Sequence, residues 1–465
     1  MVDKELETSV LSAFRRAAAD MPWYRTLLNE HGVSVDQVRD LVSFSSFCPI
    51  LSKQNTFDRF PPYQLAATTR IADVATLLTS SGHGGRFSFG LGTRREAGSG
   101  GRFMDDAFDA AFDIKSRSTL AINCLPMGVG FTSECMTVAT TSVREDMALA
   151  LVQAFGSCYD QILLASDPLF IKRLTDQADA EGTDWRRYRV NVALGEEIFG
   201  EHFRQYIATC LGLNIDTLGG GYIMSSFGVG ELGLHLCYET TATIALRRAA
   251  WRNRRLADEL LGTNASRPLP MILTFDPART FVEIADPDPR GYGMLTISML
   301  DTELPIPLLR YQPGDVAKLL DPASVAAVLE RYGLDVPGTL SSNLLALEGR
   351  AREILPNGSH VGVYKDALYA DHEVAKELTG AFRVAADCNT YTLHVQLRRP
   401  APPPHWLERR LLGAIPEQVR PNNIVVYPYH QFPFGMSIDY ERKFLYYLQE
   451  EQARPAKREL TGIDL

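Results

Sequence analysis

Hydrophobic and polar positions along this chain change their spacing from segment to segment, and the changes predict a layered fold. Over residues 5–31, apolar side chains recur at intervals of three and four, which is typical of an amphipathic helix. Pro22 interrupts this periodicity, so we expect two helices there rather than one. A further helical stretch is expected over residues 34–42.

Short apolar runs and helical periods then alternate along the chain. The runs that predict strands cover residues 71–80, 119–127, 160–166 and 188–194. Of these, 119–127 reads as a buried strand, and 71–80 as a strand that leads into a glycine-rich loop. The periods that predict helices cover residues 144–156, 168–180 and 199–211. Because strands and helices alternate, this part of the chain predicts an α/β fold with layered, mostly parallel strands.

The pattern changes again near residue 270. Residues 270–320 read as strands separated by turn residues, which predicts a β-rich subdomain. Beyond Gly349, the runs YTLHVQLRR and NNIVVYPY, with helical segments around them, predict a small α+β unit. We therefore expect a large N-terminal domain over residues 1–349, with a helical lead-in at about 1–70, and a small C-terminal domain over 350–465.

Composition narrows the classes of function. The 465 residues are 45% hydrophobic and 22% charged, with a formal net charge of −9, and an acidic chain gives no electrostatic reason to bind nucleic acid. The sequence contains no run of eighteen apolar residues, so it predicts no membrane-spanning helix. The seven cysteines form no CxxC pair, and the N-terminus lacks the apolar core of a signal peptide. We therefore expect a cytoplasmic protein with reduced thiols.

Four glycine- or charge-marked segments follow one another in the chain. The first, LTSSGHGGRFSFG at residues 78–90, combines glycines, hydroxyls and an arginine, which suit anion binding, although such segments are more often only turns. The second, FGVGELG, contains Glu231, either a magnesium ligand or an acidic residue at a helix start. The third, LRYQPGD, ends in Asp315, which suits either a turn or hydrogen bonds to a ribose diol. The fourth, LEGR, ends in Arg350.

The order and spacing of these segments resemble the adenylate-forming superfamily, in its phenylacetate–CoA ligase and acyl-protein synthetase branch. That branch carries an SSGTTGxP-like phosphate loop, a YGxTE motif, an RYxxGD motif and a GRxDD hinge. The lead-in MPWYR with ILSKQNTFDRFPPYQL, and the segment VNVALGEEIFGEHFRQY, are also similar to segments of that branch. The resemblance covers most of the chain and rests on ordered motifs rather than on one.

The resemblance implies an ATP-dependent ligase that activates an aryl or acyl carboxylic acid as its acyl-adenylate and passes it to CoA or another thiol. It implies ATP and Mg²⁺ as cofactors, CoA as a co-substrate, and a small C-terminal domain that rotates between the half-reactions. Two alternatives stay open: a ligase of secondary metabolism whose acceptor is an amine or other nitrogen nucleophile, and a degenerate homologue that only binds nucleotide. Homodimers are common in the branch, but the sequence does not decide the oligomeric state.

The resemblance also assigns roles to residues at matching positions. Glu231 is expected to hold Mg²⁺ and to act in catalysis with Arg86 and Lys443. The residues expected to bind the nucleotide are Ser80, Ser81, Gly82, His83, Gly85, Gly195, Glu196, Glu197, Phe227, Gly228, Asp315 and Arg350. The apolar residues expected to line the acid pocket include Pro126, Met127, Phe131, Phe199 and Tyr222.

The chain departs from the branch at several of these positions. In place of the usual residues it has His83-Gly84, Phe227, Gly230 and Arg352-Glu353. The lysine that many relatives carry in an SGK context has no counterpart in FPFGMSIDYERKF, where Lys443 stands several residues late. Lys443 is therefore either a substitute or a plain surface lysine, and His83 is either a phosphate donor or an exposed loop residue. These departures put efficient adenylation in question.

Overall fold

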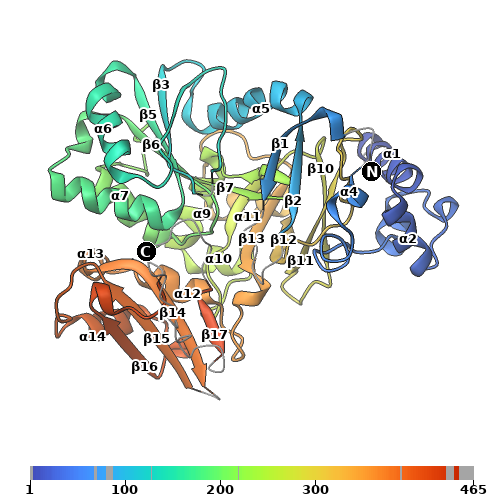
Figure 1. Ribbon diagram of the computed structural model, residues 1–465. Coiled ribbons are helices and arrows are strands. Elements are labelled where there is room, and N and C mark those ends of the chain that lie inside the picture. Colours follow the sequence, from blue (N-terminus) through green and yellow to red (C-terminus); the bar gives the residue numbers. More distant parts are fainter. Residues whose placement is uncertain are drawn as a thin grey trace, which may run out of the picture.

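The computed structural model describes residues 4–66, 71–79, 87–126, 128–217, 219–387, 390–435 and 445–449 (Figure 1). Within these ranges, the side chains of residues 96–103, 387 and 448–449 are not described. No helix of the described part is long and apolar enough to cross a membrane.

The chain begins with a helical segment that packs beside the antiparallel end of the large sheet (Figure 1). Helices α1 (Lys4–Asp20) and α2 (Pro22–Glu30) meet at Met21, which confirms the predicted break, and proline is well suited to the first helical position. The helix predicted over residues 34–42 is wrong. Only a 3₁₀ turn forms early in that range, and α3 (Leu41–Phe47) starts near its end because the Asp40 carboxylate accepts from the Ser43 backbone N–H at 2.8 Å.

One mixed sheet of eleven strands dominates the fold. Its parallel half runs in the order β4 (Thr137–Thr140), β3 (Thr119–Asn123), β5 (Gln161–Ser166), β6 (Val190–Leu194) and β7 (Ile223–Val229). Its antiparallel half continues with β8 (Gly233–Tyr238), β9 (Met271–Phe275), β13 (Leu344–Arg350), β12 (Asp315–Leu320), β11 (Gly293–Met299) and β10 (Thr280–Ala285). The α/β class is confirmed, and the predicted β-rich region joins the parallel strands in one sheet.

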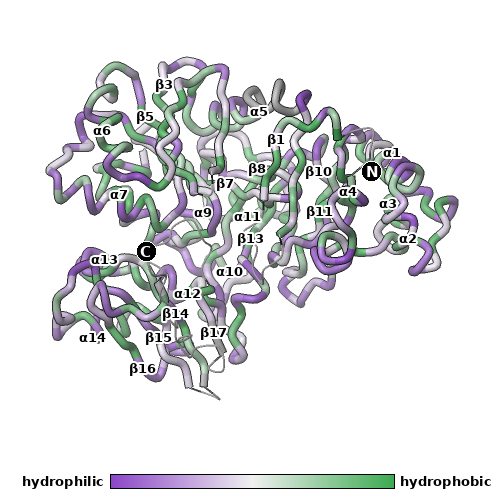
Figure 2. Tube along the Cα trace, in the orientation of Figure 1, coloured by the Kyte–Doolittle hydropathy of each residue, from purple (hydrophilic) through white to green (hydrophobic). Residues whose placement is uncertain are grey.

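Helices cover both faces of the parallel half. In β3 the side chains alternate: Leu120 and Ile122 belong to the buried cluster that includes residues of α6 (Glu145–Phe155), α7 (Pro168–Glu181) and α8 (Glu201–Leu211), whereas Ala121 belongs to a separate cluster with residues of α5 (Arg94–Phe112) and α9 (Thr241–Arg252). Because both faces are buried, these strands are almost continuously apolar. Figure 2 shows hydrophobic segments along strands such as β3 and β5.

Smaller elements complete the large part of the molecule. Strands β1 (Val74–Thr79) and β2 (Phe89–Thr93) form a separate antiparallel pair. The remaining helices of this part are α4 (Pro62–Leu65), α10 (Arg254–Leu261) and α11 (Pro322–Tyr332).

A second sheet follows the end of β13 along the chain (Figure 1). Its strands, in spatial order, are β16 (Asn423–Tyr427), β15 (Thr390–Leu397), β14 (Leu378–Asp387) and β17 (Tyr447–Gln449). The helices of this region are α12 (Val361–Ala367), α13 (His372–Glu377) and α14 (Leu407–Ala414). The predicted domain boundary falls at the last residues of β13, and the division itself stays a prediction.

Candidate active site

A cavity opens between the loop after β6, strand β7, the paired ends of β12 and β13, and helix α12. We call it the central cavity, and its empty volume is about 640 Å³, part of it open to solvent. The residues that line it are Glu196, Glu197, Ile198, Ser225, Ser226, Phe227, Gly228, Asp315, Gly349, Arg350, Arg352, Glu353 and Lys365. Six residues predicted to bind nucleotide are therefore neighbours in space, namely Glu196, Glu197, Phe227, Gly228, Asp315 and Arg350.

Asp315 and Arg350 come together through the register of β12 and β13. The two residues are direct partners in this antiparallel pair, so two motifs that are distant in the sequence share one cavity wall. Burial alone would lower the pKa of Arg350. The negative charges of Asp315 and Glu353 outweigh this effect, so the pKa of Arg350 is raised. The cavity thus holds a fixed cation beside a carboxylate that is itself almost fully buried.

Gly349 allows the end of β13 to approach its neighbours. Its φ angle is 132°, a conformation that side chains rarely allow. A Cβ at this position would lie 2.9 Å from the His360 ring and 2.9 Å from Cδ1 of Ile198. Glycine is therefore required beside Arg350 by both conformation and space.

The loop after β6 carries the predicted residues Gly195, Glu196 and Glu197. The backbone N–H of Gly195 donates to the Ser166 carbonyl at 2.9 Å, which fixes the loop to the end of β5. Glu196 has a φ angle of 67°, in the left-handed region that non-glycine residues seldom adopt. Backbone strain of this kind is concentrated at functional sites.

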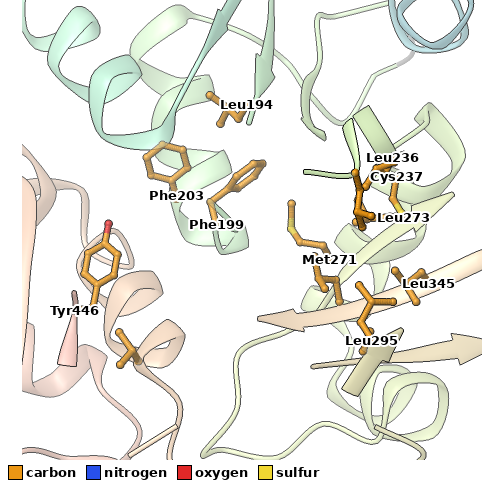
Figure 3. Packing of buried hydrophobic residues seen from close by; sticks show 14 of the residues in the cluster. Leu194, Phe199, Phe203, Leu236, Cys237, Met271, Leu273, Leu295, Leu345 and Tyr446 are labelled. Carbon is orange, nitrogen blue, oxygen red and sulfur yellow. The ribbon is translucent and has the colours of Figure 1, made fainter. Parts of the chain in front are cut away.

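Glu197 has two partners that sequence reasoning missed. Its Oε2 accepts from Lys365 Nζ at 2.7 Å and from the Tyr446 hydroxyl at 2.7 Å. Burial raises the pKa of Tyr446, and the neighbouring Glu197 carboxylate raises it further. Figure 3 shows the Tyr446 hydroxyl pointing toward the start of α8, where Phe199 and Phe203 lie.

Strand β8 places a histidine behind β7. Ser226, on the cavity wall, lies with its Oγ 2.5 Å from Nδ1 of His235, whose ring stacks on Tyr238 at 4.7 Å. Burial lowers the pKa of His235 to about 3, so this histidine is neutral near pH 7. A neutral imidazole has one donor and one acceptor nitrogen, and it therefore fixes the orientation of the Ser226 hydroxyl.

The predicted metal ligand Glu231 lies outside the cavity wall, in the turn between β7 and β8. The Tyr311 hydroxyl donates to Glu231 Oε1 at 2.6 Å, which joins the second and third motifs. A Cβ at Gly90 would lie 2.0 Å from the Gly230 carbonyl oxygen, so β2 passes directly beside this turn.

Several predicted residues fall outside the described part of the chain. They are Ser80, Ser81, Gly82, His83, Gly85, Arg86, Met127 and Lys443. On either side of the loop, Thr79 and Phe89 are partners in the β1–β2 pair. The roles assigned to these eight residues stay predictions.

A buried network of ion pairs is hydrogen-bonded to the backbone of β7, and it was not predicted from the sequence. Arg204 Nη2 donates to both oxygens of Glu239, at 2.7 and 3.0 Å, and Arg204 Nε donates to Glu201. Glu239 Oε2 also accepts from the Ser225 backbone N–H at 2.8 Å. Glu201 is shared with Arg247 and Arg248, and all five side chains are almost completely buried. The network anchors the cavity wall at Ser225.

Among the described residues, the four predicted to line an acid pocket, Pro126, Phe131, Phe199 and Tyr222, are not on the wall of the central cavity. Phe131 packs against Phe108 of α5 at 5.9 Å, and Tyr222 belongs to the same buried cluster. Phe199 instead packs into the core, with the Arg204 guanidinium 5.0 Å from its ring. The apolar cluster under α5 adjoins β7 and β8, because Tyr238 and Met224 belong to it.

Known proteins were compared with the chain by sequence and by structure. Neither a family model nor a curated protein sequence matches the chain. Among solved structures, it is similar to 2-hydroxyisobutyryl-CoA ligase in the postadenylation state in complex with 2-HIB-AMP, with a TM-score of 0.68, 12% identity, and coverage of 97% of this chain and 90% of that chain. The fold is that of an adenylate-forming CoA ligase.

The similarity depends on the state of that ligase. A second postadenylation complex, with R3-HIB-AMP, has a TM-score of 0.66, 12% identity, and coverage of 97% of this chain and 90% of that chain. In the thioesterification state, with 2-HIB-AMP and CoA, the TM-score is 0.54, with 13% identity and coverage of 96% and 89%. The TM-score is therefore higher against the two postadenylation complexes than against the thioesterification complex.

Proposed function

We propose that the protein is an ATP-dependent ligase that activates a small carboxylic acid as its acyl-adenylate and transfers the acyl group to CoA. One observation carries the proposal: Asp315 and Arg350 face one cavity together with Phe227 and Glu197, in a chain with this ligase fold. Four solved structures of 2-hydroxyisobutyryl-CoA ligase that resemble the chain hold an acyl-adenylate, and two of them also hold CoA.

In the first half-reaction, a carboxylate oxygen attacks the α-phosphorus of ATP and pyrophosphate leaves with the bonding electron pair. We assign the ribose hydroxyls to the Asp315 carboxylate and the adenine to the face of Phe227. Arg350 offers its charge to the phosphate that becomes AMP. The attack brings two anions together, so fixed cations and backbone dipoles stabilise the transition state most.

Magnesium fits this arrangement through Glu231. Among the described residues, no group of three or more histidine, cysteine, aspartate or glutamate side chains could hold a metal. Mg²⁺ bound to a nucleotide needs only one or two carboxylates, because phosphate oxygens and water complete its shell. Tyr311 holds one oxygen of Glu231, which orients the carboxylate beside β2. When bound, the metal supplies charge stabilisation at the phosphates.

In the second half-reaction, the CoA thiolate attacks the adenylate carbonyl and AMP leaves. We propose that residues 350–465 act as a C-terminal domain that moves relative to residues 1–349 between the two steps. The different similarity to the two states of one ligase supports such motion. Membership of the phenylacetate–CoA ligase-like branch, the cytoplasmic location and the homodimer stay predictions from the sequence.

The experiment that tests the proposal is an ATP–pyrophosphate exchange assay against a panel of acids that includes 2-hydroxyisobutyrate, benzoate, anthranilate and phenylacetate. Exchange dependent on one acid supports adenylation, and its loss in Asp315→Asn ties it to the central cavity. CoA, hydroxylamine and a panel of amines are then offered separately to the adenylate. Thioester formation supports CoA, whereas consumption by an amine with CoA inert favours the nitrogen-acceptor alternative. An absence of exchange with every acid, and of ATP binding, contradicts the proposal.

A further inference from the structure

A lysine outside every sequence motif lies on the wall of the central cavity. Lys365 projects from α12, with its Nζ 2.7 Å from Glu197 Oε2 and 4.1 Å from the ring centroid of Tyr446. Its side chain is 14% exposed, so the ammonium is sheltered but still faces the cavity. The helix itself is fixed, because Asp366 accepts from the His202 backbone N–H at 3.0 Å at the start of α8.

The wall of the central cavity carries more carboxylates than cations, so each cation matters for binding an anionic ligand. The charged side chains that line it are the carboxylates Glu196, Glu197, Asp315 and Glu353 and the cations Arg350, Arg352 and Lys365. Carboxylates outnumber cations, so these residues alone do not favour a polyanion such as ATP. Arg350 lies opposite Asp315, and the Arg352 side chain is exposed. Lys365 combines shelter from water with a long, adjustable side chain.

We propose that Lys365 is a catalytic residue that contacts the α-phosphate of bound ATP. This inference rests on the proposed function. The bond between the carboxylate oxygen and the α-phosphorus forms, and the bond from that phosphorus to the bridging oxygen of pyrophosphate breaks. No proton is transferred in this step, so a fixed cation is sufficient to stabilise the developing charge. Lys365 thereby takes the role that the sequence left open for Lys443.

Glu197 and Tyr446 hold the ammonium ready for this role. Glu197 lies in the loop after β6, and Tyr446 immediately precedes β17 of the small sheet, where its ring stacks on Phe382 at 4.8 Å. The three side chains therefore meet only while the small sheet is docked against the large one. This arrangement resembles the postadenylation state, so Lys365 is placed for the adenylation step rather than for thioester formation.

Nucleotide binding tests the proposal without knowledge of the acid. Lys365→Met removes the ammonium and keeps most of the side-chain length, so the Kd for ATP should rise about tenfold, as expected for one lost charge-assisted contact. The Kd for adenosine, which has no phosphate, should not change. Lys376→Met on α13 is the matched control, because Lys376 is half-exposed, and it should keep wild-type affinity for both. Lys365→Arg should keep most of the affinity for ATP.

Each outcome decides for or against the proposal. Wild-type ATP affinity in a folded Lys365→Met variant overturns the proposal. An equal loss of affinity for ATP and for adenosine also overturns it, because Lys365 then only positions Glu197. If that variant does not fold, labelling of the wild-type chain with an amine-reactive reagent decides. ATP, but not adenosine, should protect Lys365, and equal labelling with and without ATP overturns the proposal. A wild-type chain that binds no ATP contradicts the proposed function instead.

Discussion

The contacts of the buried ion-pair network at β7 predict how much stability is lost when one of its charges is removed. Glu239 is fully buried, and it accepts two hydrogen bonds from Arg204 and one from the Ser225 backbone N–H. Glu239→Gln keeps the volume of the side chain, so no cavity contributes to the effect. It removes one charge from a buried pair, and breaking such a pair costs about 3–5 kcal/mol. A domain is stable by only about 5–15 kcal/mol, so the loss is a large fraction of the total.

Urea unfolding followed by circular dichroism measures this loss. Asp146→Asn is the matched control, because the Arg144–Asp146 pair is 61% exposed on both sides and exposed pairs contribute about 0–1 kcal/mol. Glu239→Gln should also weaken AMP binding, since Ser225 lines the central cavity. A free energy of unfolding within 1 kcal/mol of wild type would show that Arg204 is adequately paired by Glu201 alone, and the reasoning would be refuted.

Three further predictions are of different kinds. Glu231→Gln should lower magnesium-dependent pyrophosphate exchange by about two orders of magnitude and leave AMP binding unchanged; equal exchange across a magnesium titration would place the metal elsewhere. The exposed Cys158 should react with a thiol reagent well before Cys237, because burial raises the pKa of Cys237 to about 12, and similar rates would contradict that burial. Burial lowers the pKa of His202, but its hydrogen bond to Asp366 and the charge of that carboxylate outweigh this effect and raise the pKa above 6.5. This pair therefore stabilises the folded chain fully below about pH 6.5, and the contribution is lost as the pH rises through the folded-state pKa. His202→Asn should remove that part of the pH dependence of the urea midpoint, and an unchanged pH profile would rule it out.

Parts of the fold that depend on short-range pattern followed from the sequence. The two N-terminal helices divide at Pro22, and the buried strands β3, β5 and β6 were visible as apolar runs. The helix expected over residues 34–42 failed because hydrogen bonds between Asp40 and Ser43 set the start of α3, and apolar spacing carries no such information. The mixed sheet was only partly predictable, since strand direction and order depend on pairing between distant segments.

The candidate site shows the same division. Asp315 and Arg350 each stand in a recognisable short motif, so they were predicted, and the β12–β13 register then makes them neighbours. Lys365 and Tyr446 stand in no motif, and they lie 168 and 249 residues from Glu197 in the sequence. Their contacts arise only from the docking of α12 and the small sheet. Tertiary contacts of this kind have no local signal that one sequence could reveal.

If ATP binds in the central cavity as proposed, the pairing of Glu197 with Lys365 explains how a cavity with more carboxylates than cations takes an anionic ligand. Without nucleotide, the two charges neutralise each other at 2.7 Å, so neither is left buried and unpaired. If ATP takes Lys365, Glu197 keeps the Tyr446 hydroxyl as a donor on the same oxygen. One ion pair is then exchanged for another rather than broken, and the cost of desolvating a free ammonium is avoided. On this proposal, the contact between Glu197 and Tyr446, which joins the two sheet regions, would change when the nucleotide binds.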